Sequence, residues 1–208
     1  MHLKRQEATT KLPIRRKGTT YIVRPSSNLN NSVPVVVALR DMLKLAKTTS
    51  EVKKMIIQKL LKINGKHVES YRQSIQLFNL LEADKPYILS LLPTGKFIFQ
   101  PTSSSDMRLT KVINKKLNKS NMIQLNLHDG TNILTKNKIS IGDTLYLDLS
   151  NKIKKHVPLE KDKAVFITSG KYIGMRGKIL KVDGKKVLIQ LENNDKTTEL
   201  NERQLIVQ

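Results

Sequence analysis

The sequence predicts a modular α+β protein in which a basic N-terminal arm precedes a small α/β domain, a β-rich domain and a small C-terminal β-barrel. Three observations carry this prediction. Residues 1–32 lack hydrophobic periodicity, residues 34–59 repeat apolar side chains at helical spacing, and from about residue 84 the apolar period falls to two. We place the boundaries at 1–32, 33–83, 84–160 and 161–208, a division that 208 residues can accommodate.

The arm is strongly basic and poor in apolar side chains. Its only acid is Glu7, whereas its basic residues are Lys4, Arg5, Lys11, Arg15, Arg16, Lys17 and Arg24. So little apolar surface cannot offset the entropy of ordering the segment. We therefore expect a mobile arm that orders along a polyanion; the alternative is a solvated tail.

The α/β domain should begin with two helices. Over residues 34–47, the apolar side chains recur at helical spacing, and Arg40, Lys44 and Lys47 should form a positive stripe on another face. Thr48 and Glu51 fit a capping box that starts a second helix, which runs to about Lys59. This second helix should bury Val52, Met55 and Ile56 and expose Lys53 and Lys54.

A hairpin should follow the second helix. In "LLKINGKHV", apolar residues alternate before Asn64-Gly65, a pair that favours the positive φ angles of a type I′ turn. Lys66 lies just beyond the turn. Two short basic helices that lead into a hairpin form a compact shape suited to RNA binding.

The β-rich domain is predicted from short alternating segments separated by turn residues. These segments are "YILSLL", "FIFQ", "MIQLNL", "TNIL", "TLYLDL" and "IKKHV". The last domain contains "AVFIT", "GKILKV", "KVLIQL" and "TTEL", with a tight turn at Asp183-Gly184. Such closely spaced short strands predict an SH3-like barrel.

Gly170, Gly174 and Gly177 raise the question of a phosphate-binding loop. A Walker loop would require glycine at Tyr172 and a hydroxyl at Ile179, and a dinucleotide loop would open a helix, not a strand. We expect instead a strand–loop–strand that presents Lys171, Tyr172, Arg176 and Lys178 to an RNA backbone, with at least one residue of the loop at positive φ. The alternative is that the glycines serve only the turns.

Composition favours a nucleic-acid partner. There are 38 Lys and Arg against 17 Asp and Glu, which gives a formal net charge of +21. A membrane surface would favour a basic amphipathic helix that carries Trp or Phe, and the chain has no Trp and only four Phe. The longest apolar run is too short to span a bilayer. The small number of Tyr and Phe argues against repeated stacking on single-stranded bases. We therefore expect a folded RNA, held mainly through its phosphates.

The sequence offers no basis for catalysis or a cofactor. Cysteine is absent, which excludes thiol chemistry and Cys-based zinc sites. The four histidines lack metal-ligand spacing. His128-Asp129 resembles part of a hydrolase dyad, but it stands beside Gly130 at an expected strand-to-strand turn. We predict no enzyme activity, no metal, no cofactor and no small-molecule substrate.

The order of these blocks resembles the archaeal and eukaryotic small-subunit ribosomal protein S four, e-type family over nearly the whole chain. The resemblance rests on "HLKR", "LPIRRK", "RPS", "VPVVVALRDMLKLAKTTSEVKKMIIQKLLKINGK", "IQLNLHDGTNIL", "GDTL" and "FITSGKYIGMRGKI". The helix–helix–hairpin is similar to the S-four RNA-binding domain, and the last block is similar to a KOW motif. The KOW resemblance implies that Gly177 is the characteristic glycine and so the residue expected at positive φ.

The resemblance implies a structural constituent of the small (30S/40S-type) ribosomal subunit. Such a protein binds rRNA, lies beside other ribosomal proteins in the cytoplasm and needs no cofactor. One alternative is a free RNA-binding or transcription-elongation factor with a KOW domain, which the charged arm disfavours. An RNA-modifying enzyme would need a further catalytic domain, for which the chain has no room.

Overall fold

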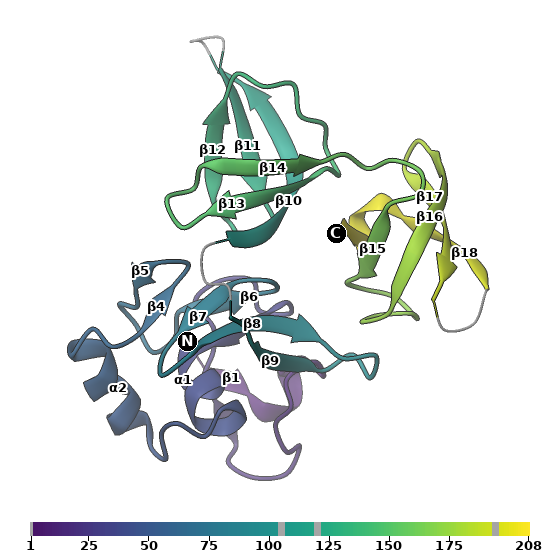
Figure 1. The fold of residues 1–208 in the computed structure, drawn as a ribbon. Coiled ribbons are helices and arrows are strands. Elements are labelled where there is room, and N and C mark those ends of the chain that lie inside the picture. The colour runs from purple at the N-terminus through teal and green to yellow at the C-terminus, as the bar shows by residue number, and fades with distance from the viewer. Residues whose placement is uncertain (1, 104–106, 119–121, 193–195) are drawn as a thin grey trace. The chain divides into compact units, whose positions relative to one another are not determined.

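The computed structural model describes residues 2–103, 107–118, 122–192 and 196–208. The fold is mostly β with few helices (Figure 1). The chain divides into two compact units, Met1–Ser105 and Asp106–Gln208. Within the described ranges, no helix is long and apolar enough to cross a membrane.

The first unit is built on a five-stranded antiparallel sheet in the order β5-β4-β7-β8-β9. Its strands are β4 (Lys62–Ile63), β5 (Lys66–His67), β7 (Leu80–Glu82), β8 (Pro86–Leu91) and β9 (Phe97–Pro101). Two smaller antiparallel pairs join β1 (Leu3–Lys4) to β2 (Tyr21–Ile22) and β3 (Ser32–Pro34) to β6 (Ser74–Gln76).

Two strands lie in a different sheet from the one that the sequence predicts. We expected β8 and β9 in a domain that starts at residue 84, but Leu80 pairs with Ile88 in the sheet of the first unit. The connection is a tight turn in which Ala83 N–H donates to the Lys85 carbonyl at 3.2 Å. The alternation of residues 86–101 indicates strands, but it does not indicate their partners, which the short connection decides.

The first helix is shorter than its apolar pattern predicts. It consists of α1 (Val35–Val37) and a π-helical segment, η2 (Ala38–Met42), and the backbone turns left-handed at Lys44, with φ 59°. Val35 to Leu39 are fully buried, so the helix provides core side chains over less than two turns.

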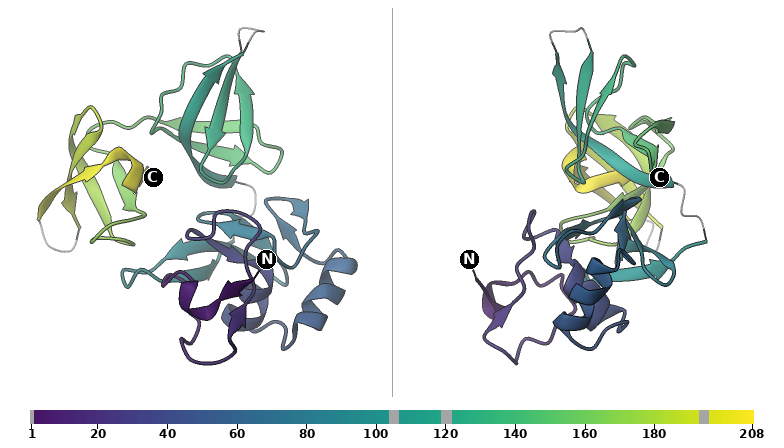
Figure 2. Two further views of the ribbon diagram at one scale, coloured as in Figure 1. Left: turned by 180° about the vertical axis from the view of Figure 1, so that it is seen from behind. Right: turned by 90° about the vertical axis from the view of Figure 1, so that its left-hand side faces the viewer.

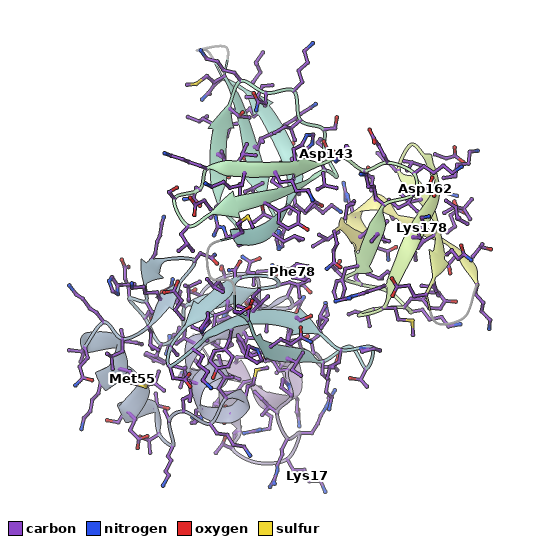
Figure 3. The ribbon with its side chains drawn as sticks, viewed as in Figure 1. Lys17, Met55, Phe78, Asp143, Asp162 and Lys178 are labelled. Atoms are coloured by element: carbon purple, nitrogen blue, oxygen red, sulfur yellow. The ribbon has the colours of Figure 1, made fainter. Side chains whose placement is uncertain are left out.

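The second helix, α2 (Thr49–Ile57), begins as its capping residues predict. The Thr48 hydroxyl accepts a hydrogen bond from Glu51 N–H at 3.2 Å. The Glu51 carboxylate accepts from Lys47 N–H at 2.7 Å, one residue earlier than a standard capping box. This hydrogen bond lowers the pKa of Glu51. Val52 is fully buried, whereas Met55 and Ile56 are half-buried (Figure 3 labels Met55).

The hairpin after α2 confirms the predicted turn. Asn64 and Gly65 have φ angles of 52° and 78° and join β4 to β5. The Asn64 side chain also accepts a hydrogen bond from Leu80 N–H at 2.9 Å, which links the turn to β7.

The N-terminal arm is folded against the first unit, contrary to the expectation of a mobile segment. It contains the β1–β2 pair and a single 3₁₀ turn, η1 (Arg5–Glu7). Leu3 and Leu12 are buried, and the Lys11 carbonyl accepts a hydrogen bond from Phe97 N–H at 2.8 Å. A few buried apolar residues thus fix the arm to the rest of the first unit, although its average composition predicts disorder.

The first sheet of the second unit has the order β12-β11-β10-β13-β14. Its strands are β10 (Met107–Leu117), β11 (Ile123–Leu127), β12 (Asn132–Thr135), β13 (Thr144–Asp148) and β14 (Ile153–Val157). Strand β10 is central, and the sequence did not predict it. A bulge at Ile113 changes which face the side chains point to, and Arg108, Thr110 and Lys111 are buried polar residues that interrupt the apolar alternation.

The second sheet has the order β18-β17-β16-β15-β19. It contains β15 (Ala164–Ile167), β16 (Arg176–Asp183), β17 (Lys186–Leu191), β18 (Thr197–Asn201) and, after the 3₁₀ turn η3 (Glu202–Gln204), β19 (Leu205–Val207). The first four strands agree with the predicted segments. The β16–β17 hairpin pairs Asp183 with Lys186, so its loop residues are Gly184 and Lys185.

Candidate nucleic-acid interface

The arm presents its cations from a loop that Arg5 holds closed. The Arg5 guanidinium donates to the carbonyls of Arg15 at 2.6 Å and Thr19 at 2.7 Å, and to the Thr19 hydroxyl at 2.7 Å. A Cβ at Gly18 would lie 3.2 Å from the Arg5 Cζ, so glycine leaves room for this guanidinium. Arg5 was predicted to contact RNA, but here it supports the loop.

The loop exposes a run of three cations. Arg15, Arg16 and Lys17 are solvent-exposed, and none of them forms an ion pair with the residues that the structure describes (Figure 3 labels Lys17). The other predicted cations of the arm differ in exposure. Lys4 is exposed and Arg24 is half-buried. Lys11 is half-buried, donates to Asn31 Oδ1 at 2.5 Å, and has its pKa lowered by desolvation.

The predicted positive stripe on the first helix is wrong. The helix ends at Met42, and the left-handed Lys44 places Lys44 and Lys47 beyond it, so that they share no helical face with Arg40. Arg40 also forms an ion pair with Asp41 at 2.9 Å, and this hydrogen-bonded contact raises its pKa. Lys44 and Lys47 are exposed on the connection to α2.

The cations of α2 and of the hairpin are exposed as predicted. Lys53 Nζ lies 5.1 Å from the centre of the Tyr71 ring, a cation–π distance, and Lys54 is its neighbour on the helix. Lys66 is exposed at the start of β5. Beside these lysines, Ile57 and Leu60 expose 79% and 55% of their surface, which gives this part of the unit an amphipathic character.

The β15–β16 loop carries Lys171 and Tyr172, and the start of β16 carries Arg176 and Lys178, the remaining predicted residues. Lys171 and Arg176 are exposed, whereas Tyr172 is half-buried and packs on the hydrophobic core of the second sheet, with Lys171 Nζ 5.8 Å from its ring centre. Lys178 is exposed and paired with Asp162 at 3.1 Å (Figure 3).

The glycines of this loop differ from the prediction in one respect. Gly170 and Gly174 have φ angles of 94° and 76°, whereas Gly177 lies in β16 with an ordinary strand backbone. A Cβ at Gly177 would come within 2.6 Å of the Gln190 carbonyl oxygen on β17. The expected positive φ at Gly177 is therefore wrong, and the residue is glycine because two strands approach closely.

The structure adds two buried cations that the sequence did not single out. Arg108 lies 3.2 Å from Asp129, and both side chains are almost completely buried; burial lowers the pKa of Arg108. Lys111 donates to the carbonyls of Glu202 and Leu205, and burial lowers its pKa to about 8. Charged side chains are rarely buried without a partner, but sequence alone does not show that these two are buried.

The remaining polar clusters are structural. The buried Asp143 carboxylate accepts from Ser140 N–H at 2.9 Å and Leu159 N–H at 3.1 Å, and lies 2.7 Å from His156 Nε2 (Figure 3 labels Asp143). It thereby ties β13 to β14 and to the connection that leads to β15. In the described part of the chain, no group of three or more His, Cys, Asp or Glu side chains could hold a metal ion.

Two family models match parts of this chain, and known proteins match most of it. Residues 83–153 match the model for "Ribosomal family S4e", and residues 161–192 match the KOW motif. Small ribosomal subunit protein eS4 of Methanococcus maripaludis is 32% identical over 93% of this chain and 87% of its own length. The chain belongs to the ribosomal S4e family. The proteins of the same name from Methanocella arvoryzae and Methanocaldococcus jannaschii are each 31% identical, over 87% and 93% of this chain.

The fold of this S4e-family member also resembles a solved structure. The crystal structure of the 30S ribosomal protein S4e from Thermoplasma acidophilum matches with a TM-score of 0.73 and 24% identity. The match covers 86% of this chain and 95% of that chain, so the likeness of fold includes nearly all of the archaeal protein.

Proposed function

We propose that this S4e-family chain is a structural constituent of the small ribosomal subunit that binds rRNA mainly through phosphate contacts. The observation that carries the proposal is the length of the resemblance: relatives named as small ribosomal subunit protein eS4 match over 93% of the chain. The partners are then small-subunit rRNA and neighbouring ribosomal proteins of the cytoplasmic ribosome. The chain acts without enzyme activity or a cofactor.

Exposed cations on both units support the phosphate contacts. On the first unit they are Lys4, Arg15, Arg16, Lys17, Lys44, Lys47, Lys53, Lys54 and Lys66, and on the second they are Lys171 and Arg176. Lys178 is exposed but already paired with Asp162, so it is a secondary candidate. Arg5, Lys11, Arg24, Arg40 and Tyr172 are less exposed and remain secondary candidates. Lysine and arginine fix a protein on nucleic acid by contacts that are independent of base sequence.

The same proposal assigns the modules. The helices and hairpin of residues 35–67 act as the S-four-like RNA-binding domain, and the sheet of residues 164–207 acts as an SH3-like KOW barrel. These assignments rest on the order of the elements and on the KOW match.

A sucrose-gradient profile of the tagged, full-length protein tests the proposal. We expect it to sediment with small subunits at low salt and to stay there at a salt concentration that removes loosely bound factors. A free KOW-containing factor would leave the ribosome at modest salt and appear at the top of the gradient. That second profile would overturn the proposal.

A further inference from the structure

Six side chains form a polar surface on β10, β11 and β12, which we name the amide face. Asn114, Asn126 and Asn132 are directly paired across the three strands, and Lys116, Gln124 and Leu134 form the next row. Both views of Figure 2 show these strands, in teal, side by side. Gln124 Nε2 donates to Asn126 Oδ1 at 3.1 Å, which connects the two rows.

The amide face points away from the hydrophobic core. On the intervening positions, Leu125 and Leu127 are buried in the core, and Ile123 and Ile133 pack against it. Because successive side chains of a strand alternate between faces, the six residues occupy the other side of the sheet. Lys116, Asn114 and Asn132 are exposed, and Leu134 exposes 52% of its surface.

Acidic side chains are absent from this part of the sequence. Between Met107 and Gly142 the only acid is Asp129, whose carboxylate is fully buried beside Arg108 at 3.2 Å. The same stretch contains seven basic residues: Arg108, Lys111, Lys115, Lys116, Lys119, Lys136 and Lys138. The second sheet differs, because its lysines 178, 181 and 186 each pair with a carboxylate at 2.8–3.1 Å. Arg108 and Lys111 are buried, whereas Lys116 is an exposed member of the amide face. The face itself contains this one cation and no acid, which suits a polyanion.

The side-chain chemistry favours one form of RNA. Carboxamides both donate and accept hydrogen bonds, as 2′-hydroxyls and the minor-groove edges of bases do. The chain has no Phe, Tyr or Trp between Phe99 and Tyr146, so the face lacks the rings on which unpaired bases stack. The outward face of the sheet suits the wide, shallow minor groove of an A-form helix, since side chains cannot read its narrow major groove.

We propose that the amide face binds the minor groove of a double-helical segment of small-subunit rRNA, an inference that rests on the function proposed above. Asn114, Asn126 and Asn132 contact the 2′-hydroxyls and base edges, and Lys116 contacts a flanking phosphate. This part of the chain was not among the predicted RNA-binding residues.

Isosteric variants of the full-length protein test the amide face. Asn126→Asp combined with Asn132→Asp places two negative charges on it without changing side-chain volume. We expect rRNA affinity to fall roughly tenfold or more. The melting temperature should fall only slightly, because the two new carboxylates stand directly opposite each other at the surface of the sheet. The control Asn201→Asp adds one such charge at an exposed helix cap, where Asp serves equally well, so the double variant should lose more affinity than two such charges account for. Equal affinities for the double variant and the control would overturn the inference.

Photo-cross-linking from position 134 separates this inference from the proposed function. A benzophenone side chain replaces Leu134, and the subunits that contain the protein are isolated and irradiated. A cross-link to a base-paired rRNA segment supports the inference. A cross-link to a ribosomal protein, to single-stranded rRNA, or to nothing overturns it while the proposed function stands. Failure of both wild type and variant to enter subunits refutes the proposed function instead.

Discussion

At the scale of single residues, Gly177 shows that a sequence can reveal where glycine is required without revealing why it is required. The sequence singled out this glycine correctly, but by the wrong argument, since its backbone is that of a strand. A Cβ would lie 2.6 Å from the Gln190 carbonyl oxygen and 2.6 Å from Ile189 Cγ2. Loop length alone cannot distinguish a positive φ from close packing, because both exclude a side chain.

Gly177→Val should therefore destabilise the second unit. The added side chain must displace β17, and overpacking of this kind costs about 1–3 kcal/mol. Thermal unfolding followed by circular dichroism measures the effect. Gly184→Asn is the control, because Gly184 has a φ of 59°, which Asn tolerates, and nothing lies within 4 Å of its Cβ position. A melting temperature equal to that of the wild type for Gly177→Val would contradict the packing argument.

Lys111 makes the stability of the second unit depend on pH. Its pKa is about 8 in the folded chain and 10.5 in the unfolded chain. Between these values the unfolded chain binds more protons, so the free energy of unfolding rises with pH. From about pH 7.5 to about pH 9.5 the expected gain is about 2 kcal/mol. The neutral amine retains two N–H groups for the carbonyls of Glu202 and Leu205.

Denaturant titrations of wild type and Lys111→Met measure this gain. The variant lacks the titrating group, so its unfolding free energy should rise less over the same pH interval, although it is less stable throughout. The difference between the two slopes isolates Lys111 from the general relief of repulsion in a basic protein. Parallel slopes would show that Lys111 is not the source.

At the scale of elements, the arm depends on a few contacts. Arg5 closes the loop that displays residues 15–17 through three hydrogen bonds of 2.6–2.7 Å. These bonds are near the surface, so they order the loop more than they stabilise the whole unit. The loop is therefore a part of the chain that can open without global unfolding.

Arg5→Gln should open this loop. Trypsin should cleave the variant after Arg15, Arg16 or Lys17 faster than it cleaves the wild type, with a melting temperature nearly unchanged. Lys4→Gln removes the same charge from an adjacent, exposed position and should be cleaved at the wild-type rate. If both variants are cleaved equally fast, the charge change and not the hydrogen bonding of Arg5 accounts for the opening.

The elements also show how much of the fold the sequence predicts. Local signals were sufficient for the Asn64-Gly65 turn, for the start of α2 at Thr48 and for most short strands. Local signals failed where tertiary contacts decide whether a segment is a strand and which strand it pairs with. Strand β10 has a bulge and buried polar residues that obscure its alternation, and β8 pairs with a strand that the boundary at residue 84 excluded.

The candidate interface was predictable to a similar degree. Composition identified the exposed cations of the arm, of α2 and of the β15–β16 loop. It could not show that Arg5 binds the carbonyl of Arg15, because these residues come together only in the folded chain. It could not show that Arg40 pairs with Asp41 either, because this contact depends on the rotamers of two adjacent side chains. The amide face was missed because asparagines on adjacent strands form a row only after their pairing is known.

At the scale of the whole molecule, RNA binding depends more on where the unpaired cations lie than on the net charge of +21. Lysines of the second sheet are neutralised by carboxylates within the chain, as in Lys181 with Asp183 at 2.9 Å. Residues 15–17 and the amide face have no such partners among the described residues. A cation already paired inside the chain gains less from a phosphate, so RNA contacts should concentrate on the unpaired groups.

The salt dependence of rRNA binding tests this distribution. Each phosphate contact releases condensed counterions, so the logarithm of affinity should fall linearly with the logarithm of salt concentration. Arg16→Gln with Lys17→Gln should reduce the magnitude of that slope by roughly one to two. Lys181→Gln with Asp183→Asn removes an ion pair, leaves the net charge unchanged and should keep the wild-type slope. A flat salt response of the wild type would refute phosphate-dominated binding, and equal slopes for the two variants would refute the assignment of contacts to unpaired cations.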